Sequence, residues 1–291
     1  MKKYTALFLM LTLMLAGCTG CEKSEKVPAP ETEEKKEDVE ETETYTFVDV
    51  LGESYVAELR EDVPACTYDY EYLTWENGYP YYKDEDGKVL SELGVDVSKY
   101  QEAVDWNQVR EAGMSFAIVR LGFRGYGEEG KLVLDEYYEQ NVQAAAAAGL
   151  KVGVYFFSQA VTEEEAREEA QFVLEHTAGY TIEGPIVFDT EEIKDDTART
   201  DNLTREEITR HCIAFCEAVE EAGREPMIYA NMKWMAFTLE LEKLTKYDKW
   251  YADYEAAPQC PYEFTIWQYT ESGTVPGIQG NADINVWFHT L

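Results

Sequence analysis

From Leu93 onward, short apolar segments alternate with amphipathic ones, and this alternation limits the fold more than any other feature of the chain. The apolar segments have the length and composition of buried strands. They are Leu93–Val97, Phe116–Leu121, Val152–Phe157, Pro185–Asp189, Pro226–Ala230, Lys249–Asp253, Phe264–Tyr269 and Ala282–Trp287. Segments with helical spacing follow each of the first five strands. They lie near Trp106–Ala112, Glu136–Ala148, Glu163–Thr177, Arg205–Ala222 and Met232–Phe237.

Capping residues mark the ends of these helices. Thr162 precedes a run of three glutamates, and Thr204 has Glu207 three residues later, which is the pattern of a helix start. Gly149 and Gly223 stand where two of the helices are expected to end. The capping signals therefore agree with the alternation of strands and helices.

Two architectures fit strands that alternate with helices. Eight strands with helices after the first five predict a parallel (β/α) barrel whose last three strands are joined by loops. The alternative is an open doubly wound sheet, which would need a glycine-rich phosphate loop after an early strand. The glycines in residues 121–127 lack that spacing, so we expect the barrel.

The N-terminus resembles a bacterial lipoprotein signal. Lys2 and Lys3 precede an apolar run at residues 4–17, which is shorter than the ~20 residues that span a membrane. Cys18 follows at the position where such signals receive a diacylglycerol. We expect residues 1–18 to be this signal, with Cys18 anchoring the chain to the outer face of the cytoplasmic membrane. An ordinary secretory peptide is the alternative.

Residues 19–44 are predicted to be a disordered acidic tether. Ten acidic and four basic residues lie between Glu22 and Thr44, with almost no large apolar side chain. Such a segment buries too little surface to offset the entropy of ordering. Residues 45–92 contain short β-rich runs between turn formers and predict a small β-rich appendage. Its aromatic residues would pack on the next domain or contact substrate.

Charge and cysteine usage exclude several classes of function. With 58 acidic and 25 basic residues the formal net charge is −33, which argues against binding nucleic acid. Cys212 and Cys216 are four residues apart on a predicted helix and are expected to pack there. Cys66 and Cys260 are candidates for a disulfide that spacing alone does not establish. No cysteine and histidine cluster has the spacing of a metal site, so we expect no metal.

Acidic residues stand at the ends of several predicted strands. Asp96 ends the first, Asp189 and Glu191 follow the fourth, Asp253 closes the sixth, and Asp283 opens the eighth. Barrel enzymes carry their catalytic groups at the C-terminal ends of their strands. Any one such acid is more often a helix cap or a solvated loop residue. Acids on four strands at corresponding ends favour a catalytic site.

Asp189 and Glu191 form the most informative pair. They are two residues apart on an extended segment, so their side chains point to the same side with Cα atoms about 6.5 Å apart. Two like charges in a partly desolvated cleft raise the pKa of one carboxyl group, which leaves a proton donor beside an ionised partner. Glycoside hydrolysis uses such a pair.

Six motifs occur in order between residues 93 and 291. They are Gly94–Gln101, Ala147–Phe157, Pro185–Glu191, Trp250–Tyr254, Trp267–Tyr269 and Asp283–Asn285. Together they resemble glycoside hydrolase family 25, the N-acetylmuramidases or lysozymes of bacteria, phages and fungi. The resemblance implies a flattened TIM-like (β/α)5(β)3 barrel over residues 93–291, with residues 45–92 as an appendage. Glu102 departs from the glycine of many members, which bears only on the local turn.

The resemblance also implies roles for the acidic residues. Glu191 matches the general acid that protonates the glycosidic oxygen. Asp189 matches the carboxylate that steers the 2-acetamido group of the substrate or the developing cation. Asp96 and Asp283 match acids that hydrogen-bond the substrate or adjust the pKa of the acid, and Asp253 matches a further active-site carboxylate.

Further residues are implied to line the sugar subsites, namely Tyr155, Trp267, Gln268 and Tyr269. Tyr155 and Trp267 have an alternative role as aromatic residues of the barrel core. The resemblance implies that the chain acts as a monomer on peptidoglycan glycan strands and needs no cofactor. It implies cleavage of the β-1,4 bond from N-acetylmuramic acid to N-acetylglucosamine.

Two other interpretations remain open at this stage. A chitinase-like hydrolase has a similar acidic strand motif, but with an additional aspartate where Val187 stands here. A wall-binding lipoprotein that has lost activity is the non-enzymatic alternative. Retention of every matched acid speaks against that alternative.

Overall fold

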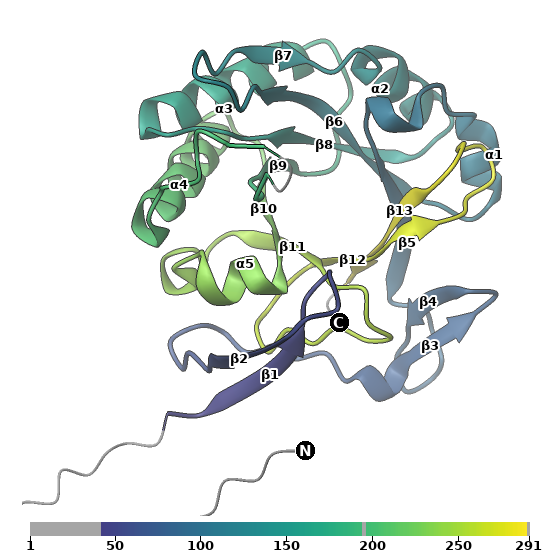
Figure 1. Cartoon of the computed structure of the whole chain (residues 1–291). Helices are drawn as coiled ribbons and strands as arrows, with labels where there is room; N and C mark the ends of the chain where they lie inside the picture. The colour runs from purple at the N-terminus through teal and green to yellow at the C-terminus, as the bar shows by residue number, and fades with distance from the viewer. Residues whose placement is uncertain (1–41, 194–195, 290–291) are drawn as a thin grey trace, which may run out of the picture. The chain divides into compact units, whose positions relative to one another are not determined.

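Eight strands close into a barrel (Figure 1). The computed structural model describes residues 42–193 and 196–289. In them β5 pairs with both β6 and β13, which closes the sheet. The barrel strands are β5 (Ser91–Val97), β6 (Phe116–Arg124), β8 (Lys151–Phe157), β9 (Ile186–Asp189), β10 (Pro226–Asn231), β11 (Asp248–Ala252), β12 (Ile266–Gly273) and β13 (Ala282–Phe288). Each overlaps a predicted strand, so the α/β barrel is confirmed and the open sheet is wrong.

Five α-helices of the described residues lie outside the barrel, in the predicted places (Figure 1). Thr162 and Thr204 cap helices as expected, and Thr204 and Glu207 form a reciprocal capping box. The helices are α1 (Trp106–Glu111), α2 (Tyr138–Ala147), α3 (Glu163–Thr177), α4 (Arg205–Glu221) and α5 (Met232–Phe237). The short 3-10 helices are η1 (Tyr70–Tyr72), η2 (Lys99–Gln101) and η3 (Leu241–Lys243). A short strand that the sequence did not predict, β7 (Leu132–Leu134), pairs antiparallel with β6.

The direction of β13 differs from the prediction of a fully parallel barrel. β13 runs antiparallel to both β12 and β5. Only a loop joins β12 to β13, whereas a parallel pair needs a longer crossover connection. The first residues of β13 therefore lie at the same rim as the last residues of the parallel strands. This reversal sets Asp283 directly opposite Asp96.

The hydrophobic core has two parts, because successive side chains on a strand face opposite sides. One part fills the space between strands and helices and includes Phe156, Phe188 and Tyr251. The other part fills the barrel interior with Phe116, Ile118, Val187, Met227, Tyr229, Trp250, Ala252 and Ile266. Because the barrel interior is packed with these side chains, the residues at the C-terminal ends of the parallel strands lie above a close-packed apolar layer.

Two antiparallel hairpins precede the barrel in the chain. One consists of β1 (Thr44–Val48) and β2 (Ser54–Glu58), and the other of β3 (Leu73–Glu76) and β4 (Tyr79–Tyr82). These hairpins are the small β-rich element that the sequence predicts before the barrel. Both belong to the same compact unit as the barrel.

Aromatic side chains attach the hairpins to the barrel. The Phe47 ring of β1 lies 6.1 Å from the Phe237 ring of α5 between ring centroids. Between the two hairpins, Tyr68 stacks on Phe288 of β13 at 4.5 Å, and Trp75 of β3 meets Tyr269 of β12 edge-on at 5.5 Å. A hairpin of this size is only marginally stable in water, so this packing is what orders it.

Several predictions concern segments beyond the barrel. The signal at residues 1–18, with Cys18, and residues 19–41 of the tether lie outside the described residues. In the part that the structure describes, Cys66 and Cys260 are free thiols, as are Cys212 and Cys216. Over the same residues no helix combines the length and apolar character needed to cross a membrane.

Candidate active site

A pocket of about 170 Å³ opens at the rim where the parallel strands end. Seven of the eight barrel strands or the residues just after them contribute to its wall, which is rich in carboxyl groups and aromatic rings. The lining residues are Asp96, Tyr155, Asp189, Glu191, Tyr229, Trp250, Tyr254, Gln268, Glu271 and Asp283. The strand-end acids Asp96, Asp189, Glu191 and Asp283 are thus brought together, as the sequence predicts.

Asp96 and Asp283 form a carboxyl pair in which Asp96 is buried and Asp283 is half-buried. They face each other across β5 and β13, and Asp283 hydrogen-bonds Asp96. Burial and the negative charge of Asp96 raise the pKa of Asp283 to about 9. Burial also raises the pKa of Asp96, although hydrogen bonds to its ionised form oppose the shift. At neutral pH the pair therefore holds one proton, which Asp283 donates to Asp96.

Two side-chain amides hold the Asp96 carboxylate in place. Gln268 Nε2 and Asn285 Nδ2 donate to Asp96 Oδ2 at 2.9 and 2.8 Å. The indole N–H of Trp250 donates to Asn285 Oδ1 at 2.7 Å, which fixes the orientation of the asparagine amide. Trp250 and Asn285 are both buried. The base of the pocket is therefore a preorganised network of hydrogen bonds.

The Gln268 amide is oriented from its other end by two tyrosines. The hydroxyl groups of Tyr229 and Tyr254 donate to Gln268 Oε1 at 3.2 and 3.1 Å. Because the carbonyl oxygen accepts these bonds, the amide nitrogen must face Asp96. Burial raises the pKa of Tyr229 well above its ordinary value, so this hydroxyl stays protonated and can donate.

Asp189 and Glu191 occupy the same pocket, as their spacing predicts. Asp189 is the last residue of β9 and is 4% exposed, whereas Glu191 is half-buried in the loop that follows. Burial, Glu191 and Asp96 all raise the pKa of Asp189, while Arg120 opposes the shift. Among the described residues, Asp189 Oδ1 finds no hydrogen-bond partner. One buried oxygen of Asp189 is thus available to a bound molecule.

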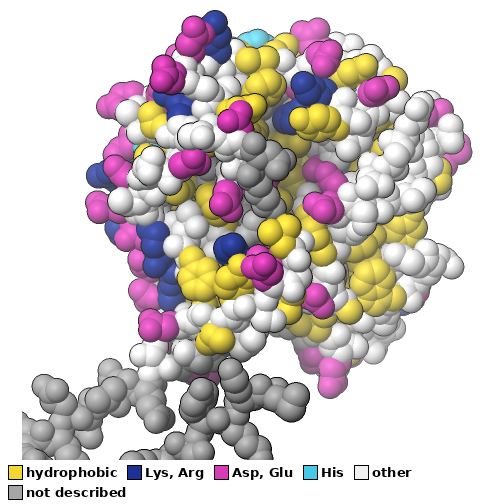
Figure 2. All heavy atoms as spheres, viewed as in Figure 1, with side chains coloured by type: hydrophobic (Ala, Val, Ile, Leu, Met, Phe, Trp, Pro, Cys, Tyr) yellow, Lys and Arg dark blue, Asp and Glu magenta, His cyan; other side chains and the backbone are white. Residues whose placement is uncertain are grey.

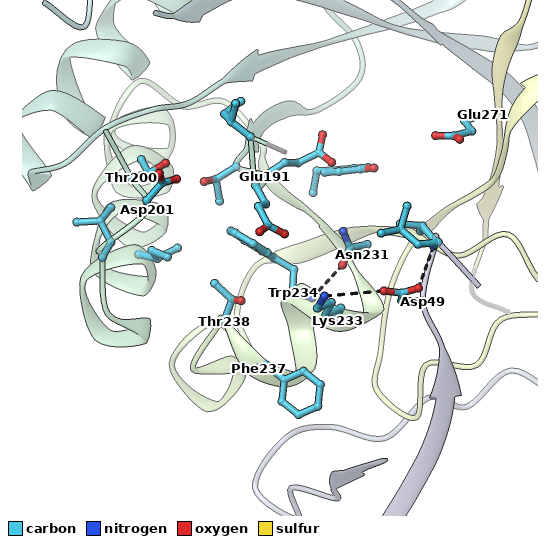
Figure 3. A pocket seen from close by; sticks show the side chains of 18 of the residues that line it. Asp49, Glu191, Thr200, Asp201, Asn231, Lys233, Trp234, Phe237, Thr238 and Glu271 are labelled. Carbon is cyan, nitrogen blue, oxygen red and sulfur yellow. Dashed lines mark hydrogen bonds and ion pairs between the residues drawn. The ribbon is translucent and has the colours of Figure 1, made fainter. Parts of the chain in front are cut away.

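A larger cleft of about 540 Å³ continues from this pocket. Four residues line both cavities, namely Glu191, Tyr229, Tyr254 and Glu271. Figure 3 shows Glu191 pointing into this cleft above α5, with Asp49 of the first hairpin on one side. On the face in Figure 2, acidic side chains outnumber basic ones. Glu191 therefore lies at the junction of two cavities whose charged lining residues are acidic apart from Lys233.

Three residues that the family resemblance implies for the site do not line either cavity. Asp253 is 2% exposed and accepts hydrogen bonds from the Tyr251 hydroxyl at 2.6 Å and from Gln259. Trp267 is fully buried and donates to the Asp253 carbonyl oxygen. Tyr269 packs against Trp75 of the appendage. On β11 and β12 the side chains of Trp250, Ala252, Ile266 and Gln268 face the barrel interior, so the residues between them face outward.

Four pocket residues were not assigned a role from the sequence. Trp250 and Tyr254 belong to the motif that also contains Asp253, and strand alternation could have singled out Trp250. Tyr229 lies in β10, whose sequence contains no acidic residue that would mark it. Glu271 follows register irregularities between β12 and β13, which reset the alternation. Within the described residues, no three His, Cys, Asp or Glu side chains are grouped to hold a metal ion.

Comparison with known proteins identifies the family. The chain is 28% identical over 207 residues to the uncharacterized protein YegX of Escherichia coli K12, covering 68% of this chain and 70% of that protein. It is 24% identical over 193 residues to the autolytic lysozyme of Clostridium acetobutylicum, covering 66% of this chain and 54% of that protein. The modular autolysin LytC of Streptococcus pneumoniae, solved with a synthetic peptidoglycan ligand, superposes with a TM-score of 0.62 at 21% identity, covering 84% of this chain but only 56% of that longer chain. The model of glycosyl hydrolases family 25 matches residues 95–278, and the chain belongs to that family.

Proposed function

We propose that this protein hydrolyses the β-1,4 glycosidic bond between N-acetylmuramic acid and N-acetylglucosamine in peptidoglycan. One observation carries the proposal: Glu191 lines both the pocket and the cleft, and it shares the pocket with the buried carboxyl groups of Asp96 and Asp189 and the half-buried one of Asp283. A glycan strand in this continuous cavity would pass Glu191. The family membership and the lysozymes among the relatives support the same activity.

Glu191 is the proposed general acid. Of the four clustered acids, Glu191 alone lines both cavities. Its carboxyl group can therefore reach an oxygen atom between two sugar units. It would donate its proton to the glycosidic oxygen as the bond from the anomeric carbon to that oxygen breaks.

Asp189 is proposed to orient the 2-acetamido group. Its unpartnered buried Oδ1 atom can accept a hydrogen bond from the acetamido N–H. Positive charge that develops near the anomeric carbon would favour the ionised form of Asp189. The acetamido oxygen then attacks the anomeric carbon, and water later opens the cyclic intermediate while Glu191 accepts the proton of that water. This sequence retains the anomeric configuration, whereas direct attack by water would invert it.

Replacement of Glu191 tests the assignment. Glu191→Gln keeps the shape of the side chain but cannot donate the proton, so we expect turnover of purified peptidoglycan to fall by at least ~10². Glu164→Gln, an exposed position on α3, is the control for loss of one charge. Mass spectrometry of the released muropeptides identifies the bond, and proton NMR of the first anomer identifies the stereochemistry. Wild-type rates in the Glu191→Gln variant would refute the assignment.

The same assays decide between the remaining alternatives. Release of oligosaccharides from chitin but not from peptidoglycan would favour the chitinase-like function. Val187, at the position of that family's additional aspartate, is fully buried in the barrel interior. Tight binding of glycan without turnover would favour a wall-binding protein.

We also propose that the protein is exported and anchored through a lipid on Cys18. The support is the run of apolar residues before this cysteine. Metabolic labelling with a fatty acid should modify the wild-type chain. The Cys18→Ala variant should remain unlabelled and leave the membrane fraction. Equal labelling of both chains would contradict the anchor.

A further inference from the structure

The large cleft has a wall that the family model does not include. The family match begins at residue 95, whereas Asp49, Val50 and Leu51 at the turn of the β1–β2 hairpin line the cleft. Residues 190–193 after β9 and three residues of α5 also line the cleft. In Figure 3 the labelled Asp49 and Lys233 lie on the same side of the cleft below Glu191. The hairpin therefore extends the candidate active site beyond the barrel.

Lys233 is the single basic residue among the described residues that line the cleft and the pocket. It is the second residue of α5, and its side chain is 40% exposed. The charged groups around it in the cleft are acidic, including Glu191, Glu192 and Glu271. A neutral glycan needs no ammonium group in such surroundings. A substituent with a carboxylate does, because elsewhere in the cavity it would meet only like charge.

The hairpin holds the ammonium group of Lys233 in position. The Nζ atom lies 5.0 Å from the centre of the Tyr55 ring and 4.0 Å from Asp49 Oδ2. The second distance makes an ion pair but is too long for a hydrogen bond, so Asp49 leaves the N–H donors of Lys233 available to a ligand. The other Asp49 oxygen, Oδ1, accepts from the N–H groups of Leu51 and Glu53 at 2.9 Å. A hydrogen bond with Tyr55 and the nearby carboxylates raise the pKa of Lys233, which keeps the side chain charged.

The hairpin is also fixed to the active-site strands. The backbone N–H and carbonyl of Val48 both bond to the side-chain amide of Gln259, at 2.8 and 2.9 Å. The same amide nitrogen donates to Asp253 Oδ1 at 3.0 Å. Asp253, which does not line the pocket, thus links the end of β11 to the hairpin. This chain of contacts fixes the end of β1, next to Asp49, against the barrel.

We propose that the cleft between the β1–β2 hairpin and α5 binds a carboxylate-bearing substituent of the glycan strand, with Lys233 as its ion-pair partner. The inference rests on the proposed function, because the cleft meets the catalytic pocket at Glu191. In peptidoglycan the carboxylate comes either from the lactyl ether of muramic acid or from a stem peptide attached to it. Both sources present the same chemistry to an ammonium group.

The test combines three substrates with three variants. Soluble glycan strands are used with their peptides, with the peptides removed so that the lactyl carboxylates are free, and with those carboxylates reduced to alcohols. The variants are Lys233→Met, Lys233→Arg and the control Lys243→Met, which removes an exposed lysine paired with Glu240 outside both cavities. The readout is kcat/KM, with KM and kcat resolved separately.

We expect Lys233→Met to lower the ratio of kcat/KM for carboxylate-bearing over reduced strands by about 5- to 10-fold, mainly through KM, as for a partly exposed charge-assisted contact. Lys233→Arg should retain most of the ratio, and Lys243→Met all of it. If Lys233→Met lowers kcat/KM only for peptide-bearing strands, the carboxylate that Lys233 binds comes from the stem peptide. If it also lowers kcat/KM for peptide-free strands, the carboxylate comes from the lactyl group. An unchanged ratio in Lys233→Met overturns the inference while leaving the proposed function intact. Failure of the wild type on all three substrates overturns the proposed function itself.

Discussion

Replacing Asp283 with asparagine tests whether the paired carboxyl groups at the base of the pocket store a proton. Burial and Asp96 raise the pKa of Asp283 from its ordinary value of 3.8 to about 9. Between these values the Asp283 carboxyl group keeps a proton in the folded protein that it lacks in the unfolded chain. The stabilisation from this proton is complete below pH 3.8 and is lost as the pH rises toward 9.

The size of the effect follows from linkage. One additional bound proton makes the free energy of unfolding fall by about 1.4 kcal/mol for each pH unit. The asparagine side chain of the variant cannot titrate, and Asp96 no longer faces a second carboxyl group. The Asp283→Asn variant should therefore lack this slope. Between pH 5 and pH 8 the difference in unfolding free energy should shift by about 4 kcal/mol in favour of the variant.

Urea unfolding followed by tryptophan fluorescence at pH 5, 6, 7 and 8 measures this difference. Asp86→Asn, at an exposed turn between β4 and β5, controls for the loss of one negative charge and should follow the wild type. The wild type, Asp283→Asn and Asp86→Asn all contain Asp189, so the effect of its raised pKa on stability cancels in the comparison. Parallel curves for wild type and Asp283→Asn would refute the shared proton.

Three further changes test the scaffold around the site. Gly94→Ala would place a methyl group 2.5 Å from the buried Phe116 ring, and we expect a loss of about 1–3 kcal/mol in unfolding free energy; an unchanged urea midpoint would contradict this packing. Arg124→Met would remove the partner of Glu169, which is fully buried and bonded to Arg124 at 2.7 Å, at a cost of about 3–5 kcal/mol. Adding Glu169→Gln should recover part of that loss, and no recovery would show that the charge is not the cause. Thr204→Ala would remove the cap of α4 and cost about 1 kcal/mol by thermal unfolding, whereas Thr204→Ser should match the wild type.

The sequence by itself determined the elements and most of the catalytic cluster. The alternation of apolar and amphipathic segments located all eight barrel strands and the five helices, because burial on a barrel imposes those periods. The spacing of Asp189 and Glu191 placed both in one pocket, since alternate residues of an extended segment share a face. The strand-end position of Asp96 has the same basis, because the C-terminal ends of parallel strands meet at one rim.

Only the tertiary structure decided which face of each strand looks inward and which distant segments meet. Asp253 ends a strand as Asp96 does, yet it faces outward and supports the hairpin, because Trp250 and Ala252 take the interior positions of β11. The reversal of β13 depends on its pairing with β5, and without that pairing Asp283 would lie at the opposite rim. Asp49 and Lys233 are far apart in the chain and have no shared motif. Their meeting beside Glu191 results from side-chain packing between a hairpin and a helix, which no local pattern encodes.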